Sequence, residues 1–141
     1  MNRSIRSSLQ SPLPLFFCPV PQVLRHTLSI NGRVVVSDLA IAEGFLRRAI
    51  GLMGRSVLRN GAGLYLRRCR CVHTCFMRFP LDLVFLDGED RVVRLVPGVG
   101  SWRVAWGGWR ARSVVELAAG WLPDGAVPVG APAVIAATPG S

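Results

Sequence analysis

The sequence predicts an α+β fold that is mostly β: a small barrel-like sheet of short strands with one principal helix near the N-terminal third. Short runs of β-branched and other apolar residues recur along the chain, separated by Gly, Pro, Asn or Asp. One segment, which follows Ser37 and Asp38, instead has apolar residues at helical spacing. The 141 residues are 50% apolar, which is enough for one core and too little for two ordinary domains.

The folded part is predicted to open with a β-hairpin. The runs VLRHTLSI and RVVV flank Asn31 and Gly32. An Asn-Gly pair between two apolar runs is the strongest short-range signal for a two-residue hairpin turn. We therefore expect two antiparallel strands within residues 23–36.

The principal helix is predicted directly after this hairpin. Ser37 and Asp38 can cap its N-terminus, and Gly51 can end it. Glu43 and Arg47 form a favourable pair four residues apart. Its apolar positions follow helical spacing: Leu39, Ala42, Leu46 and Ala49.

The rest of the domain is predicted to be strands joined by turns. Asn60-Gly61 and Asp87-Gly88 mark two of the turns. The runs expected to form strands are GLYL, VHTCFM, LDLVFLD, RVVRLV, SVVELA and PAVIA.

One compact domain is expected over residues 23–138, between an N-terminal arm of residues 1–22 and a short tail of residues 139–141. The arm has Arg near its start and an apolar stretch, but Pro14 and Pro19 interrupt that stretch. A flexible arm, or a start codon placed too early, therefore fits better than a signal peptide, and we expect a cytoplasmic protein. The alternative is export, with residues 1–22 as the signal. No apolar run approaches the roughly 20 residues of a membrane-spanning helix.

The charge is strongly basic, with a formal net charge of +9. All 17 basic residues are Arg, so Schiff-base chemistry by Lys is excluded. Planar guanidinium groups bind phosphates and carboxylates bidentately, which favours an anionic ligand or partner. Complete replacement of Lys by Arg is equally what a GC-rich coding bias produces, and basicity of that origin requires no ligand.

Three separated motifs resemble the bacterial family named domain of unknown function 192. They are RRAIGLMGRSVLRNGAGLYL, HTCFMRFPLDLVFLD and VVELAAG, and the resemblance extends over roughly residues 33–137. It implies a compact, mostly β domain with an early helix and no established reaction. Cys75 departs from the pattern, because the family more often has an aromatic residue there. The matching positions are Arg48, Gly51, Leu52, Met53, Arg55, Met77, Pro80, Asp82, Phe85, Glu116 and Gly120.

The segment RCRCVHTCFM contains a set of soft metal ligands. On an extended strand, alternation places five of them on one face: Cys69, Cys71, His73, Cys75 and Met77. Neighbours on that face are about 6.6 Å apart, so a straight strand offers one ion two ligands rather than four. Because the same geometry separates Cys71 from Cys75 by about 13 Å, it also excludes a disulfide between them. We therefore expect no metal and no cofactor.

A cysteine nucleophile is the enzymatic interpretation of the same segment. Nearby Arg side chains would lower the pKa of such a thiol. His73 is too far along the strand from Cys71 or Cys75 for a hydrogen bond, so the base would be His26, the other histidine in the sequence.

The loop SWRVAWGGWRAR interleaves Trp102, Trp106 and Trp109 with Arg103, Arg110 and Arg112. Such a mixture can stack bases while it neutralises phosphates. Burial of the indoles beneath the loop is the ordinary outcome and is favoured here. We therefore expect weak, non-specific nucleic-acid binding with a strong salt dependence.

Two acidic residues have apolar neighbours in the sequence: Asp82 at a strand start and Glu116 within a strand. Arg48 and Arg55 share the family motifs with them and are their expected partners. A structural ion pair, most directly between Glu116 and one of these arginines, is favoured over a ligand-binding or catalytic carboxylate.

The function favoured by the sequence is a non-catalytic binding or accessory module. It would have an Arg-lined site for an anionic small molecule or an acidic protein. The alternatives are a small enzyme that uses Asp82 and Glu116, or a Cys, and a nucleic-acid binder that uses the loop of residues 102–112. Converging carboxylates would indicate the enzyme, and adjacent exposed Arg and Trp would indicate the nucleic-acid binder.

Overall fold

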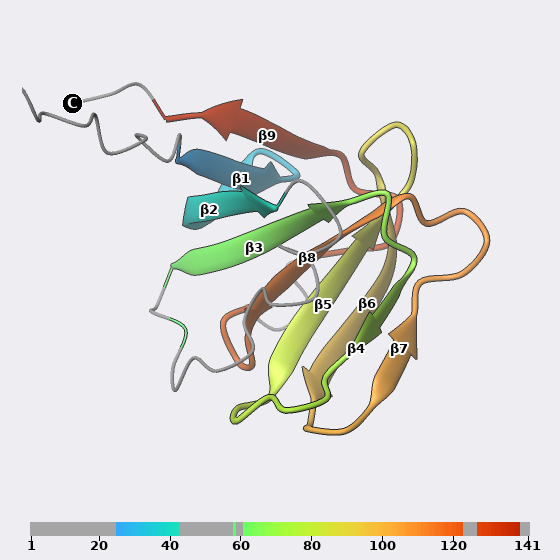
Figure 1. Ribbon diagram of the computed structural model, residues 1–141. Coiled ribbons are helices and arrows are strands. Elements are labelled where there is room, and N and C mark those ends of the chain that lie inside the picture. Colours follow the sequence, from blue (N-terminus) through green and yellow to red (C-terminus); the bar gives the residue numbers. More distant parts are fainter. Residues whose placement is uncertain (1–24, 43–57, 59–60, 123–126, 139–141) are drawn as a thin grey trace, which may run out of the picture.

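The computed structural model describes residues 25–42, 58, 61–122 and 127–138, and in these ranges the chain forms nine strands (Figure 1). The strands are β1 (His26–Ile30), β2 (Arg33–Ala42), β3 (Ala62–Arg67), β4 (Cys71–His73), β5 (Leu81–Leu86), β6 (Val92–Val99), β7 (Val104–Trp106), β8 (Ser113–Ala118) and β9 (Ala133–Ala137). The described residues contain no helix, so the predicted α+β class with a principal helix is wrong for this part of the chain.

Seven strands form one curved sheet in the order β6-β5-β8-β3-β2-β1-β9. All neighbours are antiparallel except β2 and β3, which are parallel. The first and last strands of the sheet approach each other at one end. There Arg91 bridges Pro132, and the Val92 N–H donates to the Ala131 carbonyl at 2.9 Å. The sheet is therefore a half-barrel, closed at one end (Figure 1).

The sheet has two apolar faces, each with its own core. The inner core lies inside the half-barrel and includes Leu28, Val36, Leu39, Val84, Val115 and Leu117. The outer core lies between the other face and a separate two-stranded sheet of β4 and β7. It includes Val72, Met77, Leu83, Phe85, Ala105 and Val114. Because both faces are covered, every residue of β5 is buried.

The predicted hairpin is confirmed. Asn31 and Gly32 connect β1 to β2 with φ values of 51° and 77°. Positive φ at both central residues is the requirement of a type I′ turn, whose twist matches that of paired strands.

The predicted helix start is wrong, because residues 37–42 belong to β2. The Ser37 and Asp38 N–H groups donate to the Gly61 carbonyl, and the Asp38 side chain pairs with Arg25. Leu39 and Ala42, the first two apolar positions of the predicted helix, are buried on opposite faces of β2, Leu39 in the inner core and Ala42 in the outer core. Because both faces of the sheet are covered, a strand can bury two residues three positions apart without a helix. The rest of the predicted helix, from residue 43 to Gly51, lies outside the described residues.

The later strands match their predicted runs, with two exceptions. The run VHTCFM is a strand only as far as His73, because the chain then turns. The Trp-rich loop contains the short strand β7, which the sequence did not indicate.

Candidate functional site

The two-stranded sheet of β4 and β7 covers the outer core with one face and exposes the other. Val72 pairs with Ala105, and both side chains are buried. On either side of this pair, His73 lies opposite Val104 and Cys71 lies opposite Trp106, with all four exposed. Alternation along two short strands thus presents these four side chains outward.

Two aromatic pairs lie at the two ends of β7. Before the strand, the ring centroids of Phe76 and Trp102 are 4.7 Å apart. At its other end, Trp106, the last residue of β7, meets Trp109 edge to face with the ring centroids 5.3 Å apart. These residues are 66%, 64%, 43% and 78% exposed, respectively. The sequence favoured indoles packed beneath the loop, whereas the structure exposes all three. We call Phe76, Trp102, Val104, Trp106 and Trp109 the aromatic surface.

Thr74 holds the first aromatic pair in place. Its side chain is completely buried, and its hydroxyl donates to the Gly100 carbonyl at 2.6 Å. Its backbone carbonyl accepts the N–H groups of Trp102 at 3.0 Å and Met77 at 3.2 Å. Phe76 and Trp102 both have left-handed φ values, 62° and 58°, which non-glycine residues adopt at a cost. The Thr74 hydrogen bonds thus fix an otherwise unfavourable backbone that carries two exposed rings.

Gly107 positions the second aromatic pair. Its N–H donates to the Arg70 carbonyl at 2.8 Å, which continues the pairing of β4 with β7. A Cβ at this position would overlap the ring of Phe85 and the Cβ of Ala111. The chain between Trp106 and Trp109 can therefore lie against β5 only because residue 107 is glycine.

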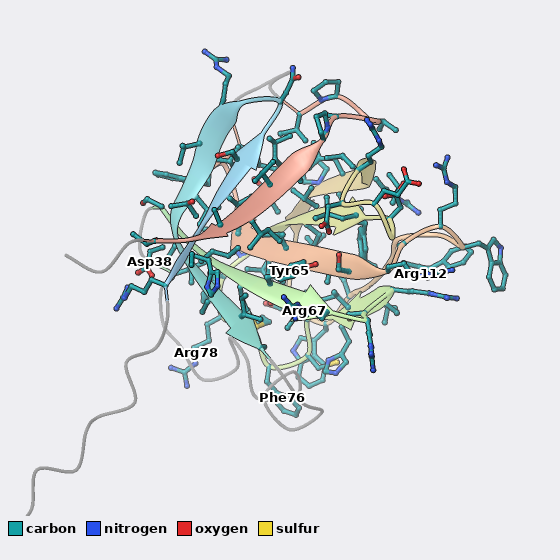
Figure 2. The ribbon with its side chains drawn as sticks, turned by 90° about the horizontal axis from the view of Figure 1, so that it is seen from above. Asp38, Tyr65, Arg67, Phe76, Arg78 and Arg112 are labelled. Atoms are coloured by element: carbon teal, nitrogen blue, oxygen red, sulfur yellow. The ribbon has the colours of Figure 1, made fainter. Side chains whose placement is uncertain are left out.

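Arginines surround the aromatic surface. Arg94 donates to the Trp106 carbonyl at 2.9 Å, and Arg112 donates to the Trp109 carbonyl at 3.1 Å. Figure 2 shows Phe76 and Arg78 projecting from the same side of the molecule. The other exposed arginines on these segments are Arg68, Arg70, Arg103 and Arg110. The guanidinium of Arg67 instead lies 6.0 Å from the ring centroid of Tyr65, a residue of the inner core.

Acidic side chains near this surface are few. Within residues 61–122, which the structure describes throughout, the exposed acids are Glu89 and Asp90 in the β5–β6 turn. Asp82, Asp87 and Glu116 are buried. The aromatic surface consequently lies in a strongly positive field.

The cysteine-rich segment does not form the single face expected of a straight strand. Cys71 and His73 are exposed, whereas Met77 is buried in the outer core. The Cys69 thiol donates to the Cys71 carbonyl, and Cys75 lies half-buried beyond the end of β4. In the described ranges, no three His, Cys, Asp or Glu side chains gather as metal ligands. His26 lies on β1 in the large sheet, whereas Cys71 belongs to the other sheet.

Asp82 is held by backbone amides. It is 2% exposed, and its two carboxylate oxygens accept the N–H groups of Gly98 at 2.8 Å and Gly120 at 3.0 Å. Both glycines have positive φ values, 63° and 82°. The carboxylate thus joins β6 to the turn after β8, which is a structural task.

Glu116 lies on the opposite face of the sheet from Asp82. It is paired with Leu64 on β3 and Leu83 on β5, so it faces the outer core, whereas Asp82 is paired with Leu117 of the inner core. Burial raises the pKa of Glu116 to about 7. Because the two carboxylates face opposite sides of the sheet, the structure does not bring Asp82 and Glu116 together in one site. The expected partners of Glu116, Arg48 and Arg55, lie outside the described residues.

Phe76 is the surface residue that sequence reasoning did not single out. It lies in the run VHTCFM, which the sequence predicts as one continuous strand, whereas β4 ends at His73 and the chain then turns. The turn depends on hydrogen bonds of Thr74 with Gly100 and Arg103, which are distant in the sequence, so the motif itself gives no signal for it.

Comparison with known proteins gives the family. The family model DUF192, described as Uncharacterized ACR, matches residues 26–134, well over half of the chain. The chain belongs to this family. UPF0127 protein PH1112 of Pyrococcus horikoshii is 35% identical over 82 residues, which are 56% of this chain and 70% of that protein. The family resemblance inferred from the motifs is thereby confirmed, and the family's function is unknown.

Two solved structures share the fold. A protein of unknown function from Novosphingobium aromaticivorans has a TM-score of 0.70 and 18% identity, with 82% of this chain and 89% of that chain covered. A protein from Sinorhizobium meliloti 1021, described as a "putative transcription regulator", has a TM-score of 0.65 and 20% identity, with 79% and 92% covered. At these identities the likeness extends to the fold alone. The described residues include no helix that is long and apolar enough to cross a membrane.

Proposed function

We propose that this DUF192 domain is a non-catalytic binding module, and that its aromatic surface binds single-stranded nucleic acid. The observation that supports the proposal is the exposure of Phe76, Trp102, Trp106 and Trp109 within residues 61–122, a fully described range whose exposed acids all lie in the β5–β6 turn. The same range carries seven exposed arginines that can accompany these rings: Arg68, Arg70, Arg78, Arg94, Arg103, Arg110 and Arg112. This role is inferred from the aromatic surface and not from the family, which is uncharacterized.

Exposed rings of this size favour a partner that covers them. Contiguous exposed apolar surface on a protein often marks an interaction site, because water solvates it poorly. Bases stack on aromatic side chains with about 1–3 kcal/mol each, and neighbouring guanidinium groups neutralise the phosphates. A surface of tryptophan and arginine meets both requirements of a single strand.

Catalysis by the two buried acids is the less favourable alternative. Asp82 already uses both carboxylate oxygens on backbone amides. Glu116 faces the opposite side of the sheet, so the two carboxylates do not converge on one substrate. The name of the Sinorhizobium meliloti relative would agree with a nucleic-acid role, but at 20% identity it carries no argument for this chain.

The proposal is tested by fluorescence anisotropy with a labelled 12-mer of deoxythymidine at several salt concentrations. Trp102→Ala or Trp109→Ala should weaken binding about tenfold at physiological salt, because one stacking platform is lost. Arg103→Gln should lower the salt dependence by about one released counterion.

The matched control is Arg33→Gln, which makes the same charge change at an exposed residue of β2. Equal effects of Arg33→Gln and Arg103→Gln, with no effect of either Trp variant, would reduce the interaction to the non-specific attraction that the sequence predicts. A third outcome is that the chain binds an acidic protein but not the oligonucleotide, and that the Trp variants lose this binding. The partner of the aromatic surface would then be a protein, and the nucleic-acid assignment would be wrong.

A further inference from the structure

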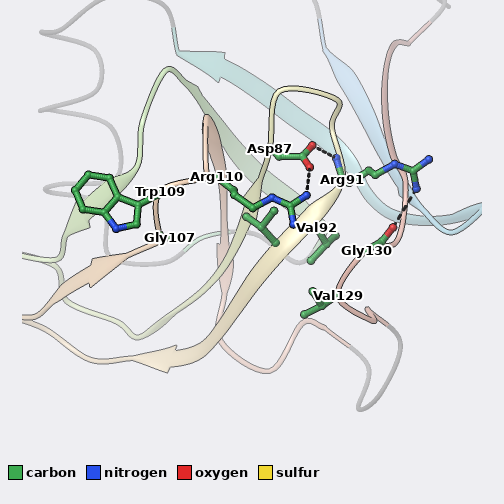
Figure 3. Close-up of a pocket in the computed structure, with 10 residues that line it drawn as sticks. Asp87, Arg91, Val92, Gly107, Trp109, Arg110, Val129 and Gly130 are labelled. Atoms are coloured by element: carbon green, nitrogen blue, oxygen red, sulfur yellow. Dashed lines mark hydrogen bonds and ion pairs between the residues drawn. The ribbon is translucent and has the colours of Figure 1, made fainter.

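We infer a second binding site, a pocket beside the aromatic surface that takes a small planar molecule carrying a carboxylate or phosphate. The pocket has a volume of about 320 Å³ and lies between the β5–β6 turn, the loop after β7 and the segment before β9 (Figure 3). The walls that matter for this assignment are Arg91, Val92, Gly108, Trp109, Arg110 and Val129.

The Arg110 guanidinium borders the pocket and retains hydrogen-bonding capacity. It is 3.5 Å from Asp87 and is largely exposed. Arg91 also lines the pocket, but its side chain is directed away from Arg110 and donates through Nη1 to the Gly130 carbonyl at 3.2 Å (Figure 3). A guanidinium has five N–H donors in a fixed fork, so the contact with Asp87 leaves donors on Arg110 for an oxyanion.

Asp87 is the acidic residue of the pocket, and its charge is already compensated. One carboxylate oxygen accepts the N–H groups of Glu89 at 2.9 Å and Arg91 at 3.0 Å, and the other faces Arg110. The Arg91 N–H contributes most to lowering the pKa of Asp87, so this carboxylate stays ionised and orients Arg110 instead of repelling a ligand. Figure 3 shows Asp87 between the two arginines.

The rest of the pocket is apolar and suits a flat hydrocarbon body. Val92 is buried, whereas Val129 and the Trp109 indole are exposed. Gly108 contributes no side chain, and nothing lies within 4 Å of the position its Cβ would occupy. A volume near the lower end of ordinary ligand sites, roughly 300–1,000 Å³, fits a molecule of one or two rings. A ligand with a negatively charged group at one end and an apolar ring system at the other therefore fits this pocket.

The test uses three probes that share one ring system: 2-naphthoate, 2-naphthyl phosphate and the uncharged 2-naphthylmethanol. Titrations of the full chain are followed by calorimetry. We expect at least one of the two anions to bind about tenfold or more tightly than the alcohol. Arg110→Met should remove most of that difference, whereas Arg103→Met, an equal charge change on the aromatic surface, should leave it intact.

Each other outcome contradicts the site. Equal affinity of the anions and the alcohol would leave only apolar adhesion, and an equal loss in Arg103→Met would indicate general electrostatic attraction. Absence of binding by all three probes would remove the site. The inference is independent of the proposed nucleic-acid function, because Trp102→Ala should weaken oligonucleotide binding and leave naphthoate binding unchanged.

Discussion

Thr74 and Arg103 are joined by reciprocal hydrogen bonds that lock two distant loops together. The Thr74 N–H donates to the Arg103 carbonyl at 2.8 Å, and the Arg103 N–H donates to the Thr74 hydroxyl at 2.9 Å. The same hydroxyl donates to the Gly100 carbonyl. One small buried side chain therefore determines how the aromatic pair of Phe76 and Trp102 stands on the surface.

Thr74→Val should destabilise the fold and weaken the aromatic surface at the same time. Valine keeps the shape of threonine but leaves the part-buried Arg103 N–H and the Gly100 carbonyl without their partner, which costs about 1–3 kcal/mol. Chemical denaturation measures the loss. The control is Thr27→Val, because the Thr27 hydroxyl makes one exposed contact of 3.5 Å. A Thr74→Val protein as stable as Thr27→Val would show that the hydroxyl is dispensable.

Asp82→Asn should lower the free energy of unfolding by about 1–3 kcal/mol. The amide keeps one acceptor oxygen but turns an NH₂ group toward the N–H of Gly98 or Gly120, so one donor faces another. Asp38→Asn is the control, since its exposed pair with Arg25 is worth about 0–1 kcal/mol. Thermal melts at neutral pH compare the two, and equal shifts would contradict the structural role of Asp82.

The stability of the protein should fall as pH rises from about 4.5 to 7. Burial raises the pKa of Glu116 from 4.5 to about 7, so in this window the folded chain binds more protons than the unfolded chain. The stabilisation is complete below the lower value and is lost as pH passes the upper one, a change of about 3 kcal/mol. Denaturation curves at pH 5 and pH 8 measure it.

Glu116→Gln should remove this pH dependence and be more stable than the parent at pH 8, because the amide carries no charge to bury. The ion pair that the sequence predicts makes the opposite forecast. If Arg48 or Arg55 neutralises Glu116, the Gln variant loses about 3–5 kcal/mol at pH 8. A single denaturation curve at that pH therefore separates the two accounts.

Gly107→Ala should cost about 1–3 kcal/mol, because the added methyl group must displace the buried ring of Phe85. It should also raise the Kd for the oligonucleotide, since the chain between Trp106 and Trp109 must move. Gly100→Ala is the control: nothing lies within 4 Å of its Cβ position, and its φ is not positive. Equal unfolding curves for the two variants would show that this contact is not tight.

The strands could be predicted from the sequence because their signals are local. Asn31-Gly32 requires positive φ, and runs such as SVVELA form a strand with the predicted bounds. The helix prediction was wrong because Leu39 and Ala42, three positions apart, are buried on opposite faces of one strand. Whether both faces of a strand are covered depends on its packing partners, which a single sequence does not reveal.

The sequence analysis identified residues of the candidate site but not how they are arranged. The tryptophans and arginines of residues 102–112 were identified, but their exposure depends on β7 pairing with β4, some thirty residues earlier in the chain. Likewise, Asp82 and Glu116 were both identified as unusual. Their separation onto opposite faces follows from the register of β5 against β8, which hydropathy does not encode.

The pairing of β1 with β9 joins residues 26–30 to residues 133–137, the first and last described strands of the chain. During synthesis, β1 has no partner on that edge until β9 has left the ribosome. An unpaired strand edge next to an open apolar interior invites association with other chains. A nascent chain of this protein therefore passes through a stage in which eight of the nine described strands are present but its half-barrel is still open, and that stage is when we expect it to depend most on chaperones.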